Sequence, residues 1–180
     1  MLTREQQTTL LRIARDSIGR QLDGAALSVN LDEYDEVLRQ PAGAFVTLKR
    51  DGELRGCIGS VVPVDPVCRA VARSAVNAAF RDPRFYPLQR EEFSEVHLEI
   101  SVMGPIVPVT SIEEIVCGRD GLIIRRGGLA GLLLPQVAVE YGWDRETFLR
   151  YTCSKAGLDS EAWHDSATRI ERFSAEVFSE

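Results

Sequence analysis

The sequence has few of the features that mark several protein classes. Its 180 residues include two histidines, two tryptophans and four cysteines, and no run of about 18 apolar residues, so it predicts no membrane-spanning helix. The polar start of the chain predicts no signal peptide. Acidic residues outnumber basic ones by 27 to 21, which argues against a general affinity for nucleic-acid backbones. These observations predict a cytoplasmic protein without nucleic-acid or membrane partners.

The cysteines and histidines do not follow a metal-binding pattern. The sequence has no Cys-x-x-Cys motif and no pair of histidines at helical spacing. It therefore predicts thiols rather than disulfides, and no metal ion, iron–sulfur cluster or other cofactor. The scattered cysteines are Cys57, Cys68, Cys117 and Cys153.

Hydrophobic periodicity predicts an α+β fold with a mostly antiparallel sheet, because helices and strands do not alternate strictly. The spacing of Thr3 and Gln6 predicts a capping box at the start of the first helix. Residues 23–42 have the composition of a loop, and Asp65-Pro66 predicts a helix start with Asp65 as N-cap. The expected helices are 3–22, 65–82, 135–141 and 144–157, and the expected strands are 44–50, 54–62, 96–102, 121–126, 129–134 and 168–178, the last at a sheet edge.

Two predicted hairpins resemble each other. Residues 50–56 can be laid on residues 125–131, and both segments contain Gly-x-Leu-x-Gly. This alignment sets Arg55 against Ala130 and Cys57 against Leu132. It predicts a duplicated hairpin and helix in which one copy has been specialised for polar work, with a chance match as the alternative.

The hexamer Leu54-Arg55-Gly56-Cys57-Ile58-Gly59 places a thiol beside a guanidinium between two glycines. It resembles the signature of the AMMECR domain family, whose prokaryotic branch is called AmmeMemoRadiSam system protein A. The resemblance covers roughly residues 8–178. The further matching segments are Phe80-Arg81-Asp82-Pro83-Arg84-Phe85, Gly118 to Leu122, Gly131 to Val137, Gly142-Trp143-Asp144, Cys153 to Leu158, and Ala162-Trp163.

The resemblance implies a single domain over residues 1–180, with two intimately packed lobes around a cleft that the hexamer lines. We expect lobes at residues 43–95 and at residues 1–42 with 96–180. The name of the prokaryotic branch records co-occurrence with a Memo-like protein and a radical-SAM enzyme. It implies partners of these kinds and does not supply a reaction.

Cys57 is the candidate catalytic residue, because a neighbouring cation favours the thiolate and Arg55 shares its face on a regular strand. Gly56 and Gly59 would leave backbone N–H groups bare for an oxyanion. Alternatively, Cys57 is a small buried side chain and a bulge requires the glycines. Neither histidine, at His97 or His164, has a motif that ties it to Cys57 as a base.

Arg81 and Arg84 form the second candidate group, because two guanidiniums near a helix end can hold a carboxylate or a phosphate. The alternative is a local pair between Asp82 and an arginine, with both phenylalanines in the core.

Two functions remain open. In the first, the protein binds a ligand or a partner through the cleft, with Leu54, Arg55, Gly56, Ile58, Gly59, Arg81 and Arg84 as contacts. In the second, it is an enzyme that uses Cys57 with Arg55 on a small anionic substrate. The absence of a clear base favours binding.

Overall fold

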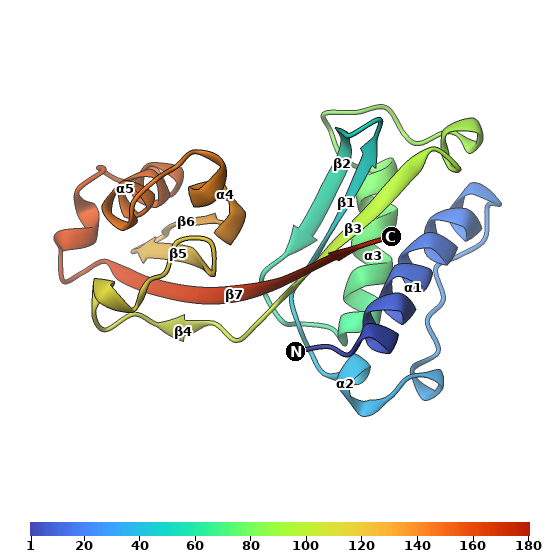
Figure 1. Ribbon diagram of the computed structural model, residues 1–180, viewed down its shortest axis with the longest axis horizontal. Helices are drawn as coiled ribbons and strands as arrows, with labels where there is room; N and C mark the ends of the chain where they lie inside the picture. Colours follow the sequence, from blue (N-terminus) through green and yellow to red (C-terminus); the bar gives the residue numbers. More distant parts are fainter. The chain divides into compact units, whose positions relative to one another are not determined.

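The computed structural model describes residues 1–180 and has an α+β fold with antiparallel strand pairs. Its contacts divide the chain into two compact units (Figure 1). Unit 1 comprises Met1–Met103 with Glu176–Glu180, and unit 2 comprises Gly104–Ala175. None of the helices combines the length and the apolar character that a bilayer crossing requires.

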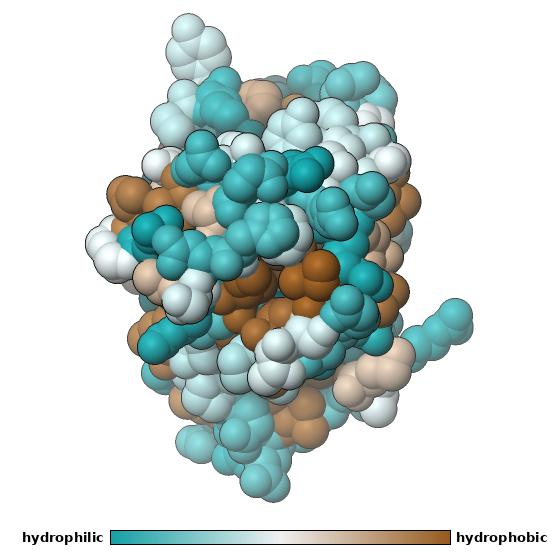
Figure 2. All heavy atoms as spheres, turned by 90° about the vertical axis from the view of Figure 1, so that its left-hand side faces the viewer, coloured by the Kyte–Doolittle hydropathy of each residue, from teal (hydrophilic) through white to brown (hydrophobic).

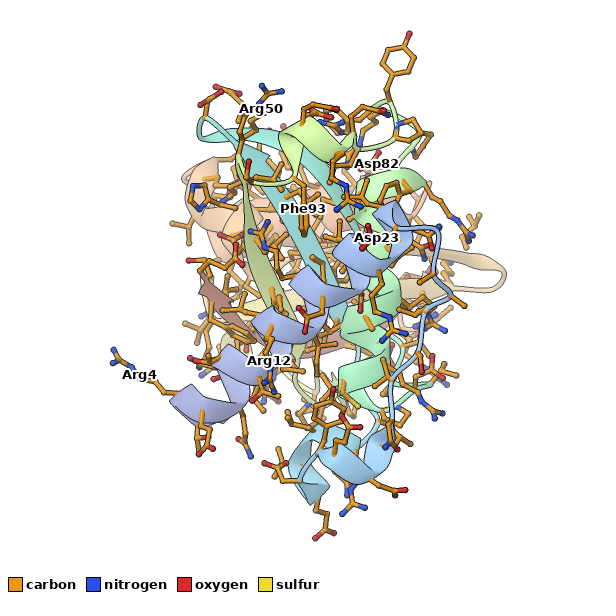
Figure 3. The ribbon with its side chains drawn as sticks, turned by 90° about the vertical axis from the view of Figure 1, so that its right-hand side faces the viewer. Arg4, Arg12, Asp23, Arg50, Asp82 and Phe93 are labelled. Atoms are coloured by element: carbon orange, nitrogen blue, oxygen red, sulfur yellow. The ribbon has the colours of Figure 1, made fainter.

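Unit 1 is a sheet with two long helices on one face (Figures 1 and 3). In the sheet, β1 lies between β2 and β3, while α1 and α3 pack against each other and against the strands. Its core consists of aliphatic side chains from both layers. The elements are α1 (Arg4–Leu22), α2 (Glu36–Arg39), β1 (Ala44–Arg50), β2 (Glu53–Ser60), α3 (Val67–Phe80) and β3 (Val96–Met103), with 3₁₀ turns at Leu31–Glu33 and Arg90–Glu92.

Unit 2 has its own core, in which Phe148 and Leu149 of α5 pack against Leu122 and Ile124 of β5. Its elements are β4 (Val107–Pro108), β5 (Asp120–Arg126), β6 (Leu129–Leu133), α4 (Pro135–Glu140), α5 (Arg145–Lys155) and β7 (Arg169–Ser179), with 3₁₀ turns at Ile112–Glu114 and Ala162–His164.

The sequence predicts β7 at a sheet edge, and this is wrong. β7 pairs with β4 on one side and with β5 on the other, so Arg172 lies opposite both Val107 and Leu122. Alternation of buried and exposed residues cannot distinguish an edge strand from a central one, because it reports only the two faces of the sheet.

The last residues of β7 belong to unit 1. The backbone N–H of Glu180 donates to the carbonyl of Leu98 at 3.2 Å. The Leu98 N–H donates to the Glu180 carboxylate at 3.0 Å, and Arg15 forms an ion pair with the same carboxylate. Glu176 accepts a hydrogen bond from the Leu2 N–H at 2.9 Å. Unit 1 is therefore built from two segments that all of unit 2 separates along the chain.

Most predicted starts and turns are confirmed. Thr3 and Gln6 form the capping box of α1, and the β1–β2 turn holds Asp51 at φ 53° and Gly52 at φ 82°. Asp65 is not the N-cap of α3, however. Pro66 occupies that position, and the Asp65 carboxylate pairs with Arg73 at 2.5 Å. The segment 23–42, expected as a loop, contains α2 and a 3₁₀ turn.

The bounds of the units differ from those of the expected lobes. The expected division separates residues 1–42 from residues 43–95. In the structure α1 packs against α3 and β3, so the first helix and the first hairpin lie in one unit. The units divide after Met103 and after Ala175 instead.

Candidate functional site

The hexamer lies on β2 and contains a β-bulge. Leu48 of β1 is opposite Gly56, whereas the next residue, Lys49, is opposite Leu54. Arg55 is therefore an extra residue without a partner on β1. The bulge breaks the alternation that the sequence analysis assumed, so residue spacing does not place Arg55 on the same face as Cys57.

Gly56 and Ile58 point toward the helical layer. A Cβ added to Gly56 would lie 2.2 Å from the carbonyl oxygen of Ala78, so only glycine allows α3 to approach β2 this closely. Ile58 packs against the core of unit 1. Both residues are expected contacts for a ligand, and in the structure they serve the packing of α3 on the sheet.

Leu54 and Cys57 lie on what we call the far face, the face of the unit 1 sheet opposite α1 and α3. Cys57 is half-buried there, and its Sγ accepts a hydrogen bond from Thr47 Oγ1 at 3.2 Å. Lys49 pairs with Glu99 at 2.9 Å. In register across β2, β1 and β3, the rows of this face are Gly59–Phe45–Ser101, Cys57–Thr47–Glu99 and Leu54–Lys49–His97.

Two side chains bind the main chain of Cys57. The Cys57 N–H donates to Asp82 Oδ2 at 2.9 Å, and its carbonyl accepts from Arg84 Nη2 at 3.3 Å. Asp82 and Arg84 also pair with each other at 2.7 Å. Because β2 ends the sheet order, these two side chains occupy the place of a neighbouring strand. We call this arrangement the edge clamp.

The edge clamp is fixed electrostatically. Asp82 is 4% exposed and accepts hydrogen bonds from the Cys57 N–H and from the N–H, Nε and Nη2 of Arg84. The hydrogen bonds from Arg84 are the main reason that the pKa of Asp82 lies far below its ordinary value. The Asp82 contact raises the pKa of Arg84 in return. Both groups therefore stay charged at neutral pH, and the Cys57 N–H is not a bare donor.

Arg55 forms a two-pronged ion pair with Glu92. Its Nε and Nη2 donate to the two carboxylate oxygens at 3.0 and 2.9 Å, and Nη2 also donates to the Tyr86 carbonyl at 3.1 Å. Arg50 reaches the same carboxylate at 3.1 Å. The hydrogen bonds from Arg55 are the main reason that the pKa of Glu92 falls to about 2. Arg55 thus anchors the loop between α3 and β3, and its Nη1 is buried without a partner.

The second candidate group, Arg81 and Arg84, lies at the end of α3 and in the loop that follows it. Arg81 is exposed at the C-cap of α3, and Phe80 packs against the core. The sequence predicts that both phenylalanines enter the core, but Phe85 does not pack against it. Its ring lies 5.9 Å from the Arg55 guanidinium carbon and 5.5 Å from that of Arg84.

Two of the four cysteines are core residues. Cys68 and Cys153 are fully buried in the cores of units 1 and 2, and burial raises the pKa of both thiols. Cys57 and Cys117 are half-buried.

Two features were not predicted from the sequence. One is a pocket of unit 1 beside α1, and the other is a stack of three rings in unit 2. Trp143 lies between Tyr141 and Tyr151, with ring centroids at 4.9 and 4.1 Å. Both tyrosines are exposed. Figure 2 shows one face of the molecule, on which hydrophobic side chains gather among hydrophilic ones. Trp143 lies in the turn before α5 and Tyr151 lies on α5, so helical periodicity does not predict their contact.

Comparisons with known proteins agree on one family. The sequence model of the AMMECR1 family matches residues 11–178. A protein of Methanothermobacter thermautotrophicus is 45% identical over 99% of this chain and 96% of its own length. A protein of Aquifex aeolicus is 44% identical over 95% of this chain and 91% of its own.

A solved structure is similar along almost the whole chain. The crystal structure of an uncharacterized protein from Pyrococcus horikoshii has a TM-score of 0.86 and 40% sequence identity. The similarity covers 96% of this chain and 90% of that one. With the hexamer on β2, the matched residues and these relatives, the chain belongs to the AMMECR1 family.

Proposed function

We propose that this protein is a binding protein that works with a Memo-like protein and a radical-SAM enzyme, and that the far face around Cys57 is its contact surface. The partners follow from the co-occurrence recorded in the name of the prokaryotic branch. The edge clamp is the observation that supports a binding role over a catalytic one. The N–H and the carbonyl of Cys57 are both hydrogen-bonded within it, so neither is left to bind a reacting substrate.

A catalytic thiol needs a base, and the neighbours of Cys57 do not supply one. Asp82 is held ionised by Arg84 and accepts four hydrogen bonds, so it is a very weak proton acceptor. His97 lies two strands away and two residues along β3, which separates its Cα from that of Cys57 by about 12 Å. This separation exceeds hydrogen-bond reach for the two side chains.

The surface near Cys57 can contact an anionic group of a partner or a small ligand. Arg84 uses Nε and Nη2 within the edge clamp, and its side chain is 55% exposed. Its Nη1 can therefore donate to a carboxylate. Arg81 is exposed three residues earlier. Leu54, which is 42% exposed on the far face, adds an apolar contact.

The test is co-purification of the tagged protein with the Memo-like and radical-SAM proteins of the same genome. Leu54→Asp should abolish capture, because it places a charge in an apolar contact. Leu129→Asp is the matched control, since Leu129 is a similarly exposed leucine on the hairpin of unit 2. Capture that Leu54→Asp leaves unchanged, or that both variants lose equally, contradicts the proposal.

The alternative function is an enzyme that uses Cys57 with Arg55 on a small anionic substrate. The hydrogen bond from Thr47 to the Cys57 sulfur favours it, because the sulfur then lies among polar side chains of the far face and not in a core. Iodoacetamide labelling near neutral pH, followed residue by residue by mass spectrometry, distinguishes the two functions. Labelling of Cys57 much faster than that of the half-buried Cys117 supports the enzyme, whereas similar slow rates support binding.

A further inference from the structure

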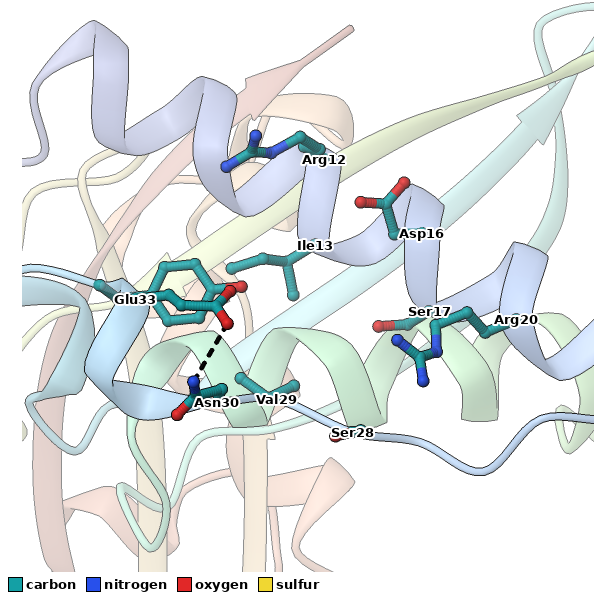
Figure 4. A pocket seen from close by; sticks show the side chains of 10 residues that line it. Arg12, Ile13, Asp16, Ser17, Arg20, Ser28, Val29, Asn30 and Glu33 are labelled. Atoms are coloured by element: carbon teal, nitrogen blue, oxygen red, sulfur yellow. Dashed lines mark hydrogen bonds between the residues drawn. The ribbon is translucent and has the colours of Figure 1, made fainter.

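A pocket lies in unit 1, between α1 and the segment that connects α1 to α2. Its volume is about 290 Å³, and the wall opposite the helix is formed by Ser28, Val29, Asn30, Glu33 and Tyr34 (Figure 4). Ile13 and Val29 supply apolar surface, and Ser17 projects into it from α1. A volume near this value holds one small molecule.

The α1 side of the pocket carries alternating charges. Arg12, Asp16 and Arg20 follow one another at intervals of four residues, so they lie on one face of the helix. Such neighbours commonly pair, as Glu146 and Arg150 do in α5 at 3.8 Å. In the structure neither arginine forms an ion pair with Asp16, and the arginine of this stretch that does form one is Arg15, with Glu180. The pocket is thus lined by opposite charges that form no ion pair with each other.

The opposite wall adds one more charge and a phenol. Glu33 accepts a hydrogen bond from Asn30 at 3.0 Å, and its carboxylate lines the pocket. Burial is the main cause that raises the pKa of Tyr34, and Glu33 and Asp16 raise it further while Arg12 lowers it. Arg12, Asp16 and Glu33 line the same pocket as the phenol. Tyr34 therefore stays protonated and can donate a hydrogen bond to a carboxylate.

We propose that this pocket binds a free α-amino acid with an apolar side chain, as a second site apart from the far face. Two guanidiniums and two carboxylates line it, so its formal charge is balanced. A phosphate or another dianion would meet Asp16 and Glu33 as well as the arginines, which disfavours it. An α-amino acid carries an ammonium and a carboxylate side by side.

The charges of an α-amino acid match neighbouring groups on α1. Successive charged residues of the helix are about 6 Å apart along its axis. This spacing suits an ammonium on Asp16 with a carboxylate on Arg20, next to the Ser17 hydroxyl. The side chain of the ligand then packs on Ile13 and Val29.

The experiment measures binding of L-leucine to the full chain by isothermal titration calorimetry. The comparison ligands are 4-methylpentanoate, which lacks the ammonium, and 3-methylbutylamine, which lacks the carboxylate. L-leucine should bind at least about tenfold more tightly than either, since each loss removes a charge-assisted hydrogen bond. Inorganic phosphate should bind more weakly than L-leucine.

Two variants test the residues. Asp16→Asn and Arg20→Gln should each weaken L-leucine binding about tenfold or more while leaving the fold intact, because both side chains are exposed. Arg4→Gln is the matched control, since Arg4 is an exposed arginine of α1 outside the pocket (Figure 3). Absence of L-leucine binding at 10 mM, equal binding of 4-methylpentanoate, tighter binding of phosphate, or an unchanged affinity in Asp16→Asn would overturn the proposal.

Discussion

The two units share one order of elements but differ in the hairpin that carries the candidate site. In each, a hairpin is followed by helical structure and then by a third strand, and the first strand lies in the middle: β2-β1-β3 in unit 1 and β6-β5-β7 in unit 2. Both hairpins also carry a glycine under a helix. A Cβ on Gly56 would lie 2.2 Å from the carbonyl oxygen of Ala78, and one on Gly131 would lie 2.3 Å from the nitrogen of Ala156.

The difference between the hairpins is a single residue. The β5–β6 register runs without interruption, with Arg125 opposite Ala130 and Ile124 opposite Gly131. In the β1–β2 hairpin, Arg55 is inserted before the matching glycine. Arg55 therefore has no counterpart in unit 2, although the sequence alignment set it against Ala130. A bulge redirected one side chain in unit 1 toward Glu92 without changing the strand order.

The strongest test of this comparison concerns the two glycines. Gly56→Ala and Gly131→Ala should each lower the free energy of unfolding by about 3 kcal/mol or more, because the new methyl group meets backbone atoms of a helix. Gly128→Ala should be almost neutral, since no atom lies within 4 Å of its added Cβ. Urea denaturation measures all three. A mild effect at only one of the two glycines would break the parallel between the units.

The edge clamp should give the next largest effect. Asp82→Ala should cost about 2–3 kcal/mol, less than a fully buried ion pair because Arg84 is half-exposed. Asp120→Ala in unit 2 is the comparison, since Asp120 is equally buried and also accepts a backbone N–H, that of Val116. Both variants should be destabilised. Hydrogen exchange of the Cys57 amide should accelerate only in Asp82→Ala, and an unchanged rate there would argue against the clamp.

Cysteine substitutions compare the far face with a core. Cys153→Ser should cost about 1–3 kcal/mol, because it buries a hydroxyl in the core of unit 2. Cys57→Ser should cost less than about 1 kcal/mol, since Thr47 can donate to the new oxygen as it does to the sulfur. Thermal unfolding of the two variants checks the difference. A larger loss at Cys57 than at Cys153 would make the hexamer a packing motif.

The smallest expected effects compare two ion pairs. Arg55→Ala should lower the free energy of unfolding by about 1–2 kcal/mol, because Arg55 and Glu92 are largely buried. Arg125→Ala should lower it by less than about 0.5 kcal/mol, because the pair of Arg125 with Glu171 is more exposed. Since the folded-state pKa of Glu92 is lowered to about 2, its contribution is present above pH 4.5 and is lost as the pH falls toward 2. Unfolding curves at several pH values should show this loss in the wild type and a smaller one in Arg55→Ala.

The elements were largely predictable from the sequence, because periodicity, capping residues and turn residues are local signals. The site was less predictable. The sequence suggested that Asp82 pairs with an arginine, but it did not show that the pair holds the main chain of Cys57, because that contact joins residues 25 positions apart. The pairing of Arg55 with Glu92, 37 positions away, depends on a bulge that no local pattern locates. The central place of β7 depends on its pairing, which alternation does not encode.

The membership of residues 176–180 in unit 1 has a consequence for synthesis of the chain. Residues 1–103 leave the ribosome first and contain most of this unit, yet Glu176 and Glu180, which bind Leu2, Arg15 and Leu98, are translated after all of unit 2. Domains generally fold in the order of their translation. Unit 1 is the first to be synthesised but the last to complete its fold. Its α1 and β3 form their contacts with residues 176–180 only after unit 2 has been synthesised.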